Sequence, residues 1–362
     1  MTGLPVRPEL VGEVPYGAPQ LDVPYLLNVN ENPYPPSDAV AAEIATAVAA
    51  AVKTMNRYPE RDAVALRADL AAYLGHGLTA DQVWAANGSN EVMLHVLMAF
   101  GGPGRSVLSF APTYSMYPEY ARDTHTAWVT FPRRDDFTID PVAAVDAIHD
   151  RQPDVIFVAS PNNPTGTAVP SETLRAIATA ATGVVVVDEA YHEFARTGTP
   201  SALGLLPEFP RLAVTRTMSK AFAFAGGRVG YLAASREFVD ALRVVRLPYH
   251  LSAITQTVAR VALAHADELL AAVDRLRANR DDLAAWLADS GLQVADSDAN
   301  FVLFGRFADR QAVWQALLDE GVLIRVVGPE GWLRVSAGTD EEMAAFKAAL
   351  DQVLKTEEGR LQ

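Results

Sequence analysis

The sequence contains no cysteine among its 362 residues. This absence excludes a disulfide framework, a thiolate nucleophile and a metal or iron–sulfur site ligated by cysteine, so any covalent catalysis must use another side chain. Basic residues are also scarce, because 30 Lys and Arg stand against 44 Asp and Glu and give a net charge of -14. Binding to a polyanion needs clustered positive charge, so this balance argues against nucleic acid as a partner.

Signals for export and for membrane insertion are missing as well. The first thirty residues hold no basic segment followed by an apolar core, and they do not resemble a secretory signal. The longest apolar run, at 41–52, is rich in alanine and interrupted by Glu43, which is typical of a packed helix rather than a membrane span. The sequence therefore predicts a cytoplasmic protein without a membrane partner.

What the chain does contain is a long alternation of apolar strands and helical segments. After a proline-rich arm, a helix is expected from Ser37 or Asp38 to about Val52. Several of the strands that follow are apolar on both faces, as in a mostly parallel sheet with helices on each side. The fold class is therefore α/β. The strands are expected at 83–87, 106–110, 126–130, 154–160, 183–189, 211–217 and 229–234.

The pattern changes after Ser252. One long helix is expected from there to about Ser290, followed by short strands at 291–296, 300–305 and 322–326, a strand at 332–338 and a terminal helix from about Thr339. This order predicts a smaller α+β domain, and the chain is long enough for two domains. We expect an N-terminal arm at 1–32, a large α/β domain at 33–250 and a small α+β domain at 251–362.

The most informative segment, TRTMSKAFAFAGGRVGY at 215–231, follows a strand. It brings Thr217, Ser219, Lys220 and Arg228 together around two glycines, so it could hold a phosphate while presenting an amine to an aldehyde. A loop lysine is ordinarily only solvated, and its neighbours are what favour the chemical interpretation. Schiff-base chemistry needs a partly neutral amine, which desolvation or a nearby cation provides. Arginine suits a phosphate because its planar fork donates two hydrogen bonds.

These residues resemble the fold-type I pyridoxal-phosphate enzymes, in particular the class II aminotransferases of the aspartate-aminotransferase-like group. In that family the lysine of a T-x-S-K stretch forms a Schiff base with pyridoxal 5′-phosphate, and an arginine eight residues later binds the cofactor phosphate. Lys220 and Arg228 have this spacing, and Thr217 and Ser219 supply the hydroxyls. The resemblance runs almost from end to end, from NVNENPYPP at 28–36 to WLRVSAG at 332–338.

Three more candidates follow strands, where ligands bind in open α/β sheets. Asp188 ends the strand VVVVD and is either a helix cap or, by resemblance, the carboxylate that pairs with the cofactor's ring nitrogen. The resemblance places Tyr191 on the cofactor's phenolic oxygen. Asn163, in the segment PNNPTG, would contact the same oxygen, although the composition is also that of a turn.

Other parts of the cofactor site are expected in earlier segments. Ser89 and Asn90 precede or begin a helix, and by resemblance they complete the phosphate site, although Gly-Ser there is also an ordinary cap. Tyr114 is either a packing residue or the aromatic ring that stacks on the cofactor. Tyr58 matches a tyrosine that crosses from a neighbouring subunit to the cofactor phosphate, which implies a homodimer with shared sites.

Arg334 lies mid-strand between apolar residues, where an arginine usually faces solvent or pairs with an acid. The resemblance makes it the residue that receives the substrate's anionic group. The arm at 14–22 is similar to that of the family members that act on histidinol phosphate. Tyr16, Tyr117 and Tyr249 match tyrosines that hold the phosphate of the substrate in those members. The substrate-site candidates implied in this way are Tyr16, Asn30, Tyr117, Tyr249 and Arg325, with Arg334 the strongest.

The resemblance thus implies transamination of histidinol phosphate with 2-oxoglutarate, giving imidazole-acetol phosphate and glutamate in histidine biosynthesis. Lys220, Asp188 and Tyr191 are the expected catalytic residues, pyridoxal 5′-phosphate is the cofactor, and no metal is required. Two alternatives lie within the family, an aromatic amino-acid aminotransferase and an amino-acid-phosphate decarboxylase. A nucleotide-binding α/β protein is a third, although no G-x-G-x-x-G follows the first strand.

Overall fold

The computed structural model describes residues 4–356 and 359–361; residues 1–3 of the expected arm and 357, 358 and 362 of the expected small domain lie outside this range. Within the described residues the largest sheet has seven strands in the order β2-β8-β7-β6-β5-β3-β4. Strand β8 runs antiparallel to both of its neighbours, and the other pairs are parallel. The strands are β2 (Val83–Ala86), β3 (Ser106–Ala111), β4 (Ala127–Pro132), β5 (Val155–Ala159), β6 (Val184–Asp188), β7 (Leu212–Thr217) and β8 (Gly230–Ala234).

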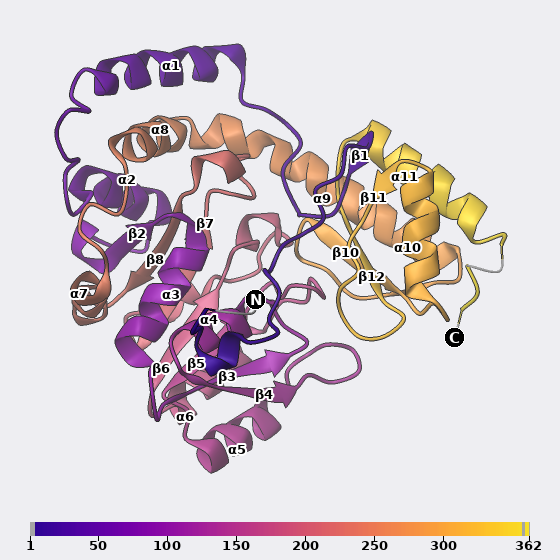
Figure 1. The fold of residues 1–362 in the computed structure, drawn as a ribbon, viewed down its shortest axis with the longest axis horizontal. Helices are drawn as coiled ribbons and strands as arrows, with labels where there is room; N and C mark the ends of the chain where they lie inside the picture. The colour runs from indigo at the N-terminus through magenta and orange to yellow at the C-terminus, as the bar shows by residue number, and fades with distance from the viewer. Residues whose placement is uncertain (1–3, 357–358, 362) are drawn as a thin grey trace.

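All strands expected between 83 and 234 are thus confirmed, and so is the covering of both faces of the sheet by helices (Figure 1). In β6, Val185 and Val187 belong to one hydrophobic cluster, whereas Val184 and Val186 belong to another. The first cluster includes α2 (Val64–Leu74), α5 (Pro141–Arg151), α6 (Ser171–Ala180) and α8 (Ala253–Ala264). The second includes α3 (Gly88–Phe100), α4 (Tyr117–Asp123) and α7 (Arg236–Val245). Alternate side chains of a strand point to opposite faces, so an unbroken valine run supplies two cores.

The last hundred residues build a second, smaller body, on the right in Figure 1. In the part of the chain that the structure describes, its antiparallel sheet has three strands, β9 (Gln293–Val294), β10 (Phe301–Gly305) and β12 (Leu333–Ser336). It packs with α9 (Ala266–Asp289), α10 (Arg310–Asp319) and α11 (Asp340–Val353). The arm joins this body, because β1 (Tyr25–Leu26) pairs in parallel with β11 (Val322–Leu323).

Helix α9 connects the two bodies. Leu269, near its start, belongs to a core of the large sheet, whereas Leu283 and Leu287 belong to the core of the small one. The core of the large sheet therefore continues past residue 250. The division of the chain into an arm and two domains remains a proposal.

The helix expected from 252 to 290 is wrong as a single element. It is interrupted at His265, whose backbone (φ -108°, ψ 25°) leaves the helical region, so that α8 ends at Ala264 and α9 begins at Ala266. The His265 Nε2 atom lies 2.8 Å from a carboxylate oxygen of Glu43 in α1 (Asp38–Val52). Contact between α8 and α1 thus sets the direction of the chain there, and neither proline nor glycine marks the break.

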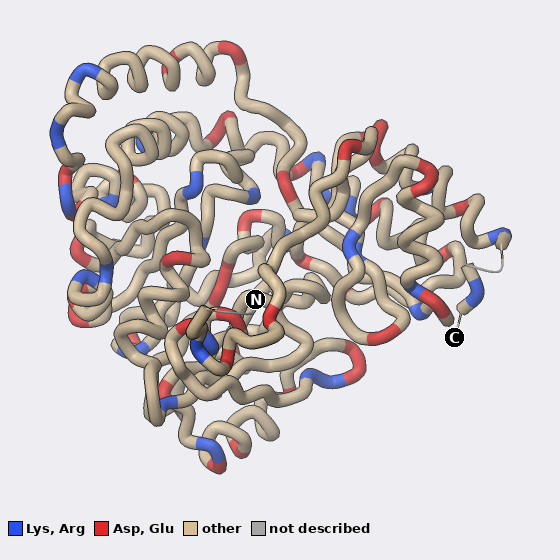
Figure 2. Tube along the Cα trace, in the orientation of Figure 1, with Lys and Arg blue, Asp and Glu red and all other residues tan. Residues whose placement is uncertain are grey.

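Helix α1 begins where the sequence predicts, with the Ser37 hydroxyl accepting a hydrogen bond from the backbone N–H of Val40. Acidic and basic residues are interspersed over both bodies (Figure 2). Among the helices that the structure describes, none combines the length and the apolar composition needed to cross a membrane.

Candidate active site

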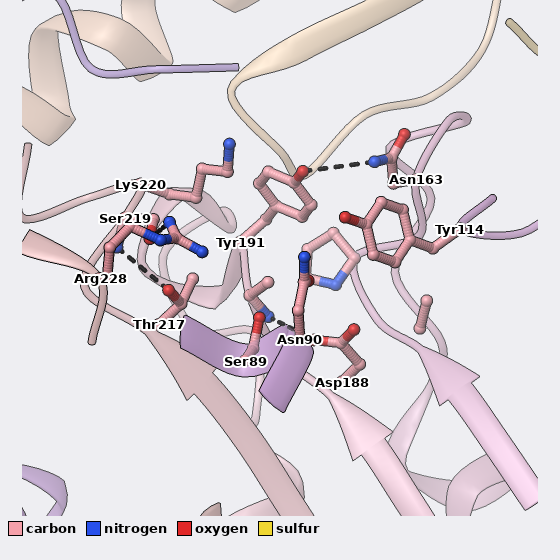
Figure 3. A pocket seen from close by; sticks show the side chains of 13 residues that line it. Ser89, Asn90, Tyr114, Asn163, Asp188, Tyr191, Thr217, Ser219, Lys220 and Arg228 are labelled. Atoms are coloured by element: carbon pink, nitrogen blue, oxygen red, sulfur yellow. Dashed lines mark hydrogen bonds between the residues drawn. The ribbon is translucent and has the colours of Figure 1, made fainter. Parts of the chain in front are cut away.

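A pocket with about 610 Å³ of empty space opens where β5, β6 and β7 end (Figure 3). Ala159, Asp188 and Thr215 are direct neighbours across these three parallel strands, so the polar residues that follow each strand meet at one edge. The pocket lies at this edge of the sheet. Its lining includes ten of the residues expected from the sequence, namely Ser89, Asn90, Tyr114, Asn163, Asp188, Tyr191, Thr217, Ser219, Lys220 and Arg228.

Lys220 lies in the turn that follows β7, and its amine faces the pocket. The Nζ atom donates a hydrogen bond to the carbonyl of Val29, 2.7 Å away, and has no carboxylate partner within the described residues. Burial, and then repulsion by the Arg334 guanidinium, lowers the pKa of Lys220 from 10.5 to about 8. The amine is therefore partly neutral near physiological pH, which is the form that attacks a carbonyl carbon.

Asp188 ends β6, and only 7% of its surface is exposed. Three donors hold its carboxylate. The Tyr117 hydroxyl donates to Oδ2 at 2.8 Å, and the Thr215 hydroxyl and the Ala190 N–H each donate to Oδ1 at 3.2 Å. Burial raises the pKa of Asp188, and these hydrogen bonds oppose that rise. Such a carboxylate is suited to pairing with a cationic group of a ligand.

The end of the pocket at Arg228 offers groups suited to an anion. Ser89 and Asn90 are in the first turn of α3, where the backbone N–H groups lack helical partners and favour an anion. The backbone of Arg228 has a φ of 52°, and its Nη1 atom lies 3.4 Å from the Ser219 hydroxyl. A Cβ atom at Gly88 would lie 2.6 Å from the Arg228 guanidinium. Glycine at this position therefore permits the arginine to approach the start of the helix.

A second pocket adjoins the first and shares four of its residues, Tyr114, Asn163, Tyr191 and Lys220. Arg334 of β12 lines it, and this side chain is 5% exposed. Its guanidinium donates to the Asn163 side chain at 2.5 Å and to the Asn28 carbonyl at 2.8 Å, while Nε lacks a partner and no carboxylate pairs with it among the described residues. Burial lowers the pKa of Arg334 to about 10. A buried cation without an acid is a strong site for an anionic ligand.

Arg325 and Arg334 are directly opposite each other in an antiparallel bridge, with backbone N–H···O distances of 3.0 Å in both directions. Side chains of such a pair lie on the same face, and both guanidinium groups line the second pocket. Arg325 bonds to the Gly17 carbonyl, which brings it against the arm. The arm also places the Tyr16 hydroxyl 2.8 Å from that of Ser115 at this pocket. Asn30 lies there too, and its amide donates to the Tyr191 hydroxyl at 3.1 Å.

Tyr117 does not lie where a contact with the substrate phosphate requires it. Its side chain is fully buried in the core beneath α4, it lines neither pocket, and its hydroxyl bonds to Asp188. The expectation that it binds the substrate phosphate is therefore wrong. The two aromatic residues of TYSMY, which the spacing alone does not distinguish, face different surroundings: Tyr114 lines both pockets and Tyr117 packs behind them.

Tyr249 and Tyr58 lie outside both pockets of the chain that carries them. Their rings stack on each other, with centroids 4.5 Å apart, and 80% of Tyr58 is exposed. Tyr249 has a φ of 58°, which turns it toward Tyr58 after α7. Contact of Tyr249 with the substrate phosphate therefore stays a prediction. For Tyr58, contact across a subunit boundary stays a prediction.

Sequence analysis missed several groups that hold the expected residues in place. Thr215 could have been found, because it lies two residues before Thr217 on the same face of β7 and pairs in register with Asp188. The Val29 and Asn28 carbonyls, which accept hydrogen bonds from Lys220 and Arg334, carry no side-chain signal. Ser115 beside Tyr114 was likewise not recognised, because its importance depends on where the arm crosses.

The fold and these adjoining pockets are suited to an enzyme that acts through a buried, partly neutral lysine. The family model for aminotransferases of class I and II matches residues 24–350, and the chain belongs to this family. A histidinol-phosphate aminotransferase from Thermobifida fusca is 62% identical over 347 residues, which cover 96% of this chain and 95% of the relative. Histidinol-phosphate aminotransferase 3 from Burkholderia lata is 60% identical over 361 residues, which cover 99% and 98%.

A solved structure of a related enzyme has the same fold. The crystal structure of histidinol-phosphate aminotransferase from Sinorhizobium meliloti in complex with pyridoxal-5′-phosphate matches with a TM-score of 0.86 and 25% identity. The match covers 98% of this chain and 99% of that one. The fold-type I architecture implied by the sequence resemblance is therefore confirmed, as is membership among the aminotransferases.

The pocket fits the cofactor that this family membership implies. Pyridoxal 5′-phosphate carries an aldehyde, a ring nitrogen that can be protonated, a phenolic oxygen and a phosphate. The pocket offers groups of matching chemistry: the Lys220 amine, the buried Asp188 carboxylate, the Tyr191 and Asn163 side chains, and the cradle of α3 with Arg228. Because Gly88 lets the Arg228 guanidinium approach the free N–H groups at the start of α3, the two together would suit the cofactor phosphate.

Proposed function

We propose that the protein transfers the amino group of histidinol phosphate to 2-oxoglutarate, giving imidazole-acetol phosphate and glutamate as a step of histidine biosynthesis. The observation that carries the proposal is the pair Arg334 and Arg325, two cations beside the Lys220 amine without an acidic partner among the described residues. A phosphate monoester carries about -1.5 to -2 charges at neutral pH and suits two guanidinium groups better than a single carboxylate does. The names of the relatives at 62% and 60% identity support the same substrate.

On the cofactor side, Lys220 would bind pyridoxal 5′-phosphate, with its phosphate held by Arg228, Ser89, Asn90, Thr217 and Ser219. When bound, the cofactor supplies an electron-withdrawing ring that stabilises negative charge on the substrate carbon. Asp188 would pair with the positive charge of the ring nitrogen, and Tyr191 and Asn163 would provide hydrogen bonds to the phenolic oxygen. Tyr114 would pack against the ring.

On the substrate side, Lys220 Nζ has the location and the lowered pKa required of a general base. In its neutral form it removes the proton from the carbon that bears the amino group. Arg334 orients the substrate through the phosphate of histidinol phosphate or a carboxylate of glutamate. Arg325, Tyr16 and Asn30 line the same pocket and add donors for the remaining oxygens.

The pH dependence of cofactor capture tests the assignment of Lys220. Only a neutral amine attacks an aldehyde, and the pKa of Lys220 is about 8 rather than 10.5. We expect the rate at which cofactor-free protein captures pyridoxal phosphate to rise with pH, up to about tenfold per unit below pH ~8, and to level off above it. Stopped-flow absorbance measures this rate. A rate that keeps climbing to pH ~10, as for a free lysine side chain, would contradict the assignment.

The substrate assignment is tested by comparing histidinol phosphate with phenylalanine as amino donors to 2-oxoglutarate. We expect kcat/KM for histidinol phosphate to exceed that for phenylalanine by about a hundredfold or more, because the single carboxylate of phenylalanine, placed on Arg334, leaves the half-buried Arg325 without an anionic partner. A coupled assay of glutamate formation measures both. A preference for phenylalanine would refute the substrate and favour the aromatic aminotransferase.

One substitution sharpens this comparison. Arg325→Gln should lower kcat/KM for histidinol phosphate and leave kcat/KM for phenylalanine nearly unchanged. The ratio of kcat/KM for histidinol phosphate to that for phenylalanine should therefore fall by about tenfold or more. Arg175→Gln is the matched control, because Arg175 lies in α6, pairs with Glu208 and lines neither pocket. An equal loss with both substrates in Arg325→Gln would instead indicate a general effect on the pocket.

The active unit proposed here is a homodimer with shared sites. The exposed Tyr58, stacked on Tyr249 outside its own pocket, supports this arrangement, because aromatic pairs at a surface are common at interfaces. Tyr58 would then reach the cofactor phosphate of the partner subunit. The cytoplasmic location remains a prediction.

A further inference from the structure

Tyr117 is fully buried, yet its hydroxyl meets a functional group of the pocket. It is the first residue of α4 and packs against Phe157 and Tyr120 in the core on one face of the large sheet. The hydroxyl donates to Asp188 Oδ2 at 2.8 Å, the shortest of the hydrogen bonds to this carboxylate among the described residues. One polar atom of the core, the Tyr117 hydroxyl, therefore contacts the base of the pocket.

The hydrogen-bond donors around Asp188 are divided between its two carboxylate oxygens. Tyr117 serves Oδ2, whereas Thr215 and the backbone of Ala190 serve Oδ1. A carboxylate held at both oxygens cannot rotate freely, and donors to its charged form oppose the effect of burial. Burial and the neighbouring Asp188 raise the pKa of Tyr117 well above 10, so the phenol keeps its proton and acts only as a donor.

Tyr120, one turn further along α4, provides a contrast. It is also buried, but its hydroxyl has no hydrogen-bond partner within the described residues. Packing alone therefore does not require a tyrosine hydroxyl in this helix to find a carboxylate. Tyr117 in addition contacts the ring of Tyr114 edge to face, with centroids 5.5 Å apart, so it touches both Asp188 and an aromatic residue of the pocket wall.

We propose that Tyr117 is a positioning residue that fixes the orientation of the Asp188 carboxylate and keeps it charged for the bound cofactor. This inference rests on the proposed function, since it assumes that Asp188 pairs with the ring nitrogen of pyridoxal phosphate. Tyr117 was expected from the sequence to contact the substrate; the role proposed here is instead to hold Asp188 from behind the pocket.

The variant Tyr117→Phe removes the hydroxyl and keeps the ring. A hydrogen bond to a charged group contributes enough to predict a cofactor dissociation constant raised by roughly ten- to a hundredfold. In single-turnover reactions with glutamate, the maximal rate should fall by a similar factor, while the concentration giving half the maximal rate stays within about twofold. Tyr117 lines neither pocket, so a positioning role leaves substrate binding intact. Tyr120→Phe is the matched control and should behave as the wild type in both measurements.

A second variant approaches the same carboxylate from the other oxygen. Thr215→Val removes a donor to Oδ1 with almost no change in volume, and it should weaken cofactor binding in the same direction. The inference is overturned if Tyr117→Phe binds the cofactor as tightly as the wild type and Tyr120→Phe. It is also overturned if the half-saturating glutamate concentration rises as much as the rate falls, since that indicates a distorted pocket. A wild-type protein that binds no pyridoxal phosphate would instead refute the proposed function.

Discussion

Replacing Lys220 with alanine is expected to abolish transamination, with kcat reduced at least about a thousandfold, and to remove the absorbance that distinguishes a Schiff base with lysine from free pyridoxal phosphate. The methyl group can neither bond to the aldehyde nor carry a proton at the substrate carbon. Steady-state assays and absorbance spectra of the purified variant measure the two effects. The phosphate cradle of α3 and Arg228 is untouched, so the variant should still bind the cofactor without a covalent bond.

Lys347→Ala is the matched control for this experiment. Lys347 lies in α11 and pairs with Asp282 at 2.5 Å, and it lines neither pocket. Its loss should leave both the spectrum and the rate close to those of the wild type. A Lys220→Ala protein that keeps the absorbance and full turnover would rule out Lys220 as the residue that binds the cofactor.

The second large effect is expected at Asp188. Asp188→Asn keeps the size of the side chain but removes the negative charge proposed to pair with the ring nitrogen. We expect kcat to fall by about a hundred- to a thousandfold, the range seen when one preorganised electrostatic group is removed from an active site. The Schiff base to Lys220 should still form, because Lys220 is unchanged. The loss of rate with retention of the absorbance separates this variant from Lys220→Ala.

Asp154→Asn provides a control on the same sheet. Asp154 precedes β5 at the opposite end from the pocket, and its carboxylate accepts a hydrogen bond from the Ser106 N–H at 2.9 Å. An asparagine oxygen can accept the same bond, so activity should persist. Equal rates in Asp188→Asn and the wild type would show that the charge of Asp188 is not needed.

The elements that could be predicted from the sequence are those governed by local pattern. Strands β2 to β8 followed from apolar runs of the right length, and the start of α1 followed from Ser37 as a cap. The break at His265 could not be predicted, because it depends on how α8 packs beside α1 and not on any local signal. The pairing of β1 with β11 likewise joins segments almost three hundred residues apart.

The site shows the same division at the level of single side chains. Asp188, Asn163 and Lys220 each follow a strand, so their meeting at one edge followed from the rule for parallel sheets. For the tyrosines, sequence position alone gave no such guide. Tyr114 and Tyr117 are three residues apart, yet one lines the pockets and the other packs in the core, because Tyr114 lies in the loop before α4 whereas Tyr117 begins that helix.

By itself the sequence determined the α/β fold and the edge of the sheet where Asp188, Asn163 and Lys220 meet, because periodicity and motif spacing act over short stretches of chain. Its family resemblance also indicated Lys220 as the proposed reactive amine. Only the tertiary structure decided which groups surround that amine. The lowered pKa of Lys220 arises from burial and from Arg334, more than a hundred residues away. The guanidinium groups of Arg325 and Arg334, which pair with no carboxylate among the described residues, face one pocket because the segments that carry them form a β-bridge. Charge and desolvation depend on distance in space, which the order of residues does not contain.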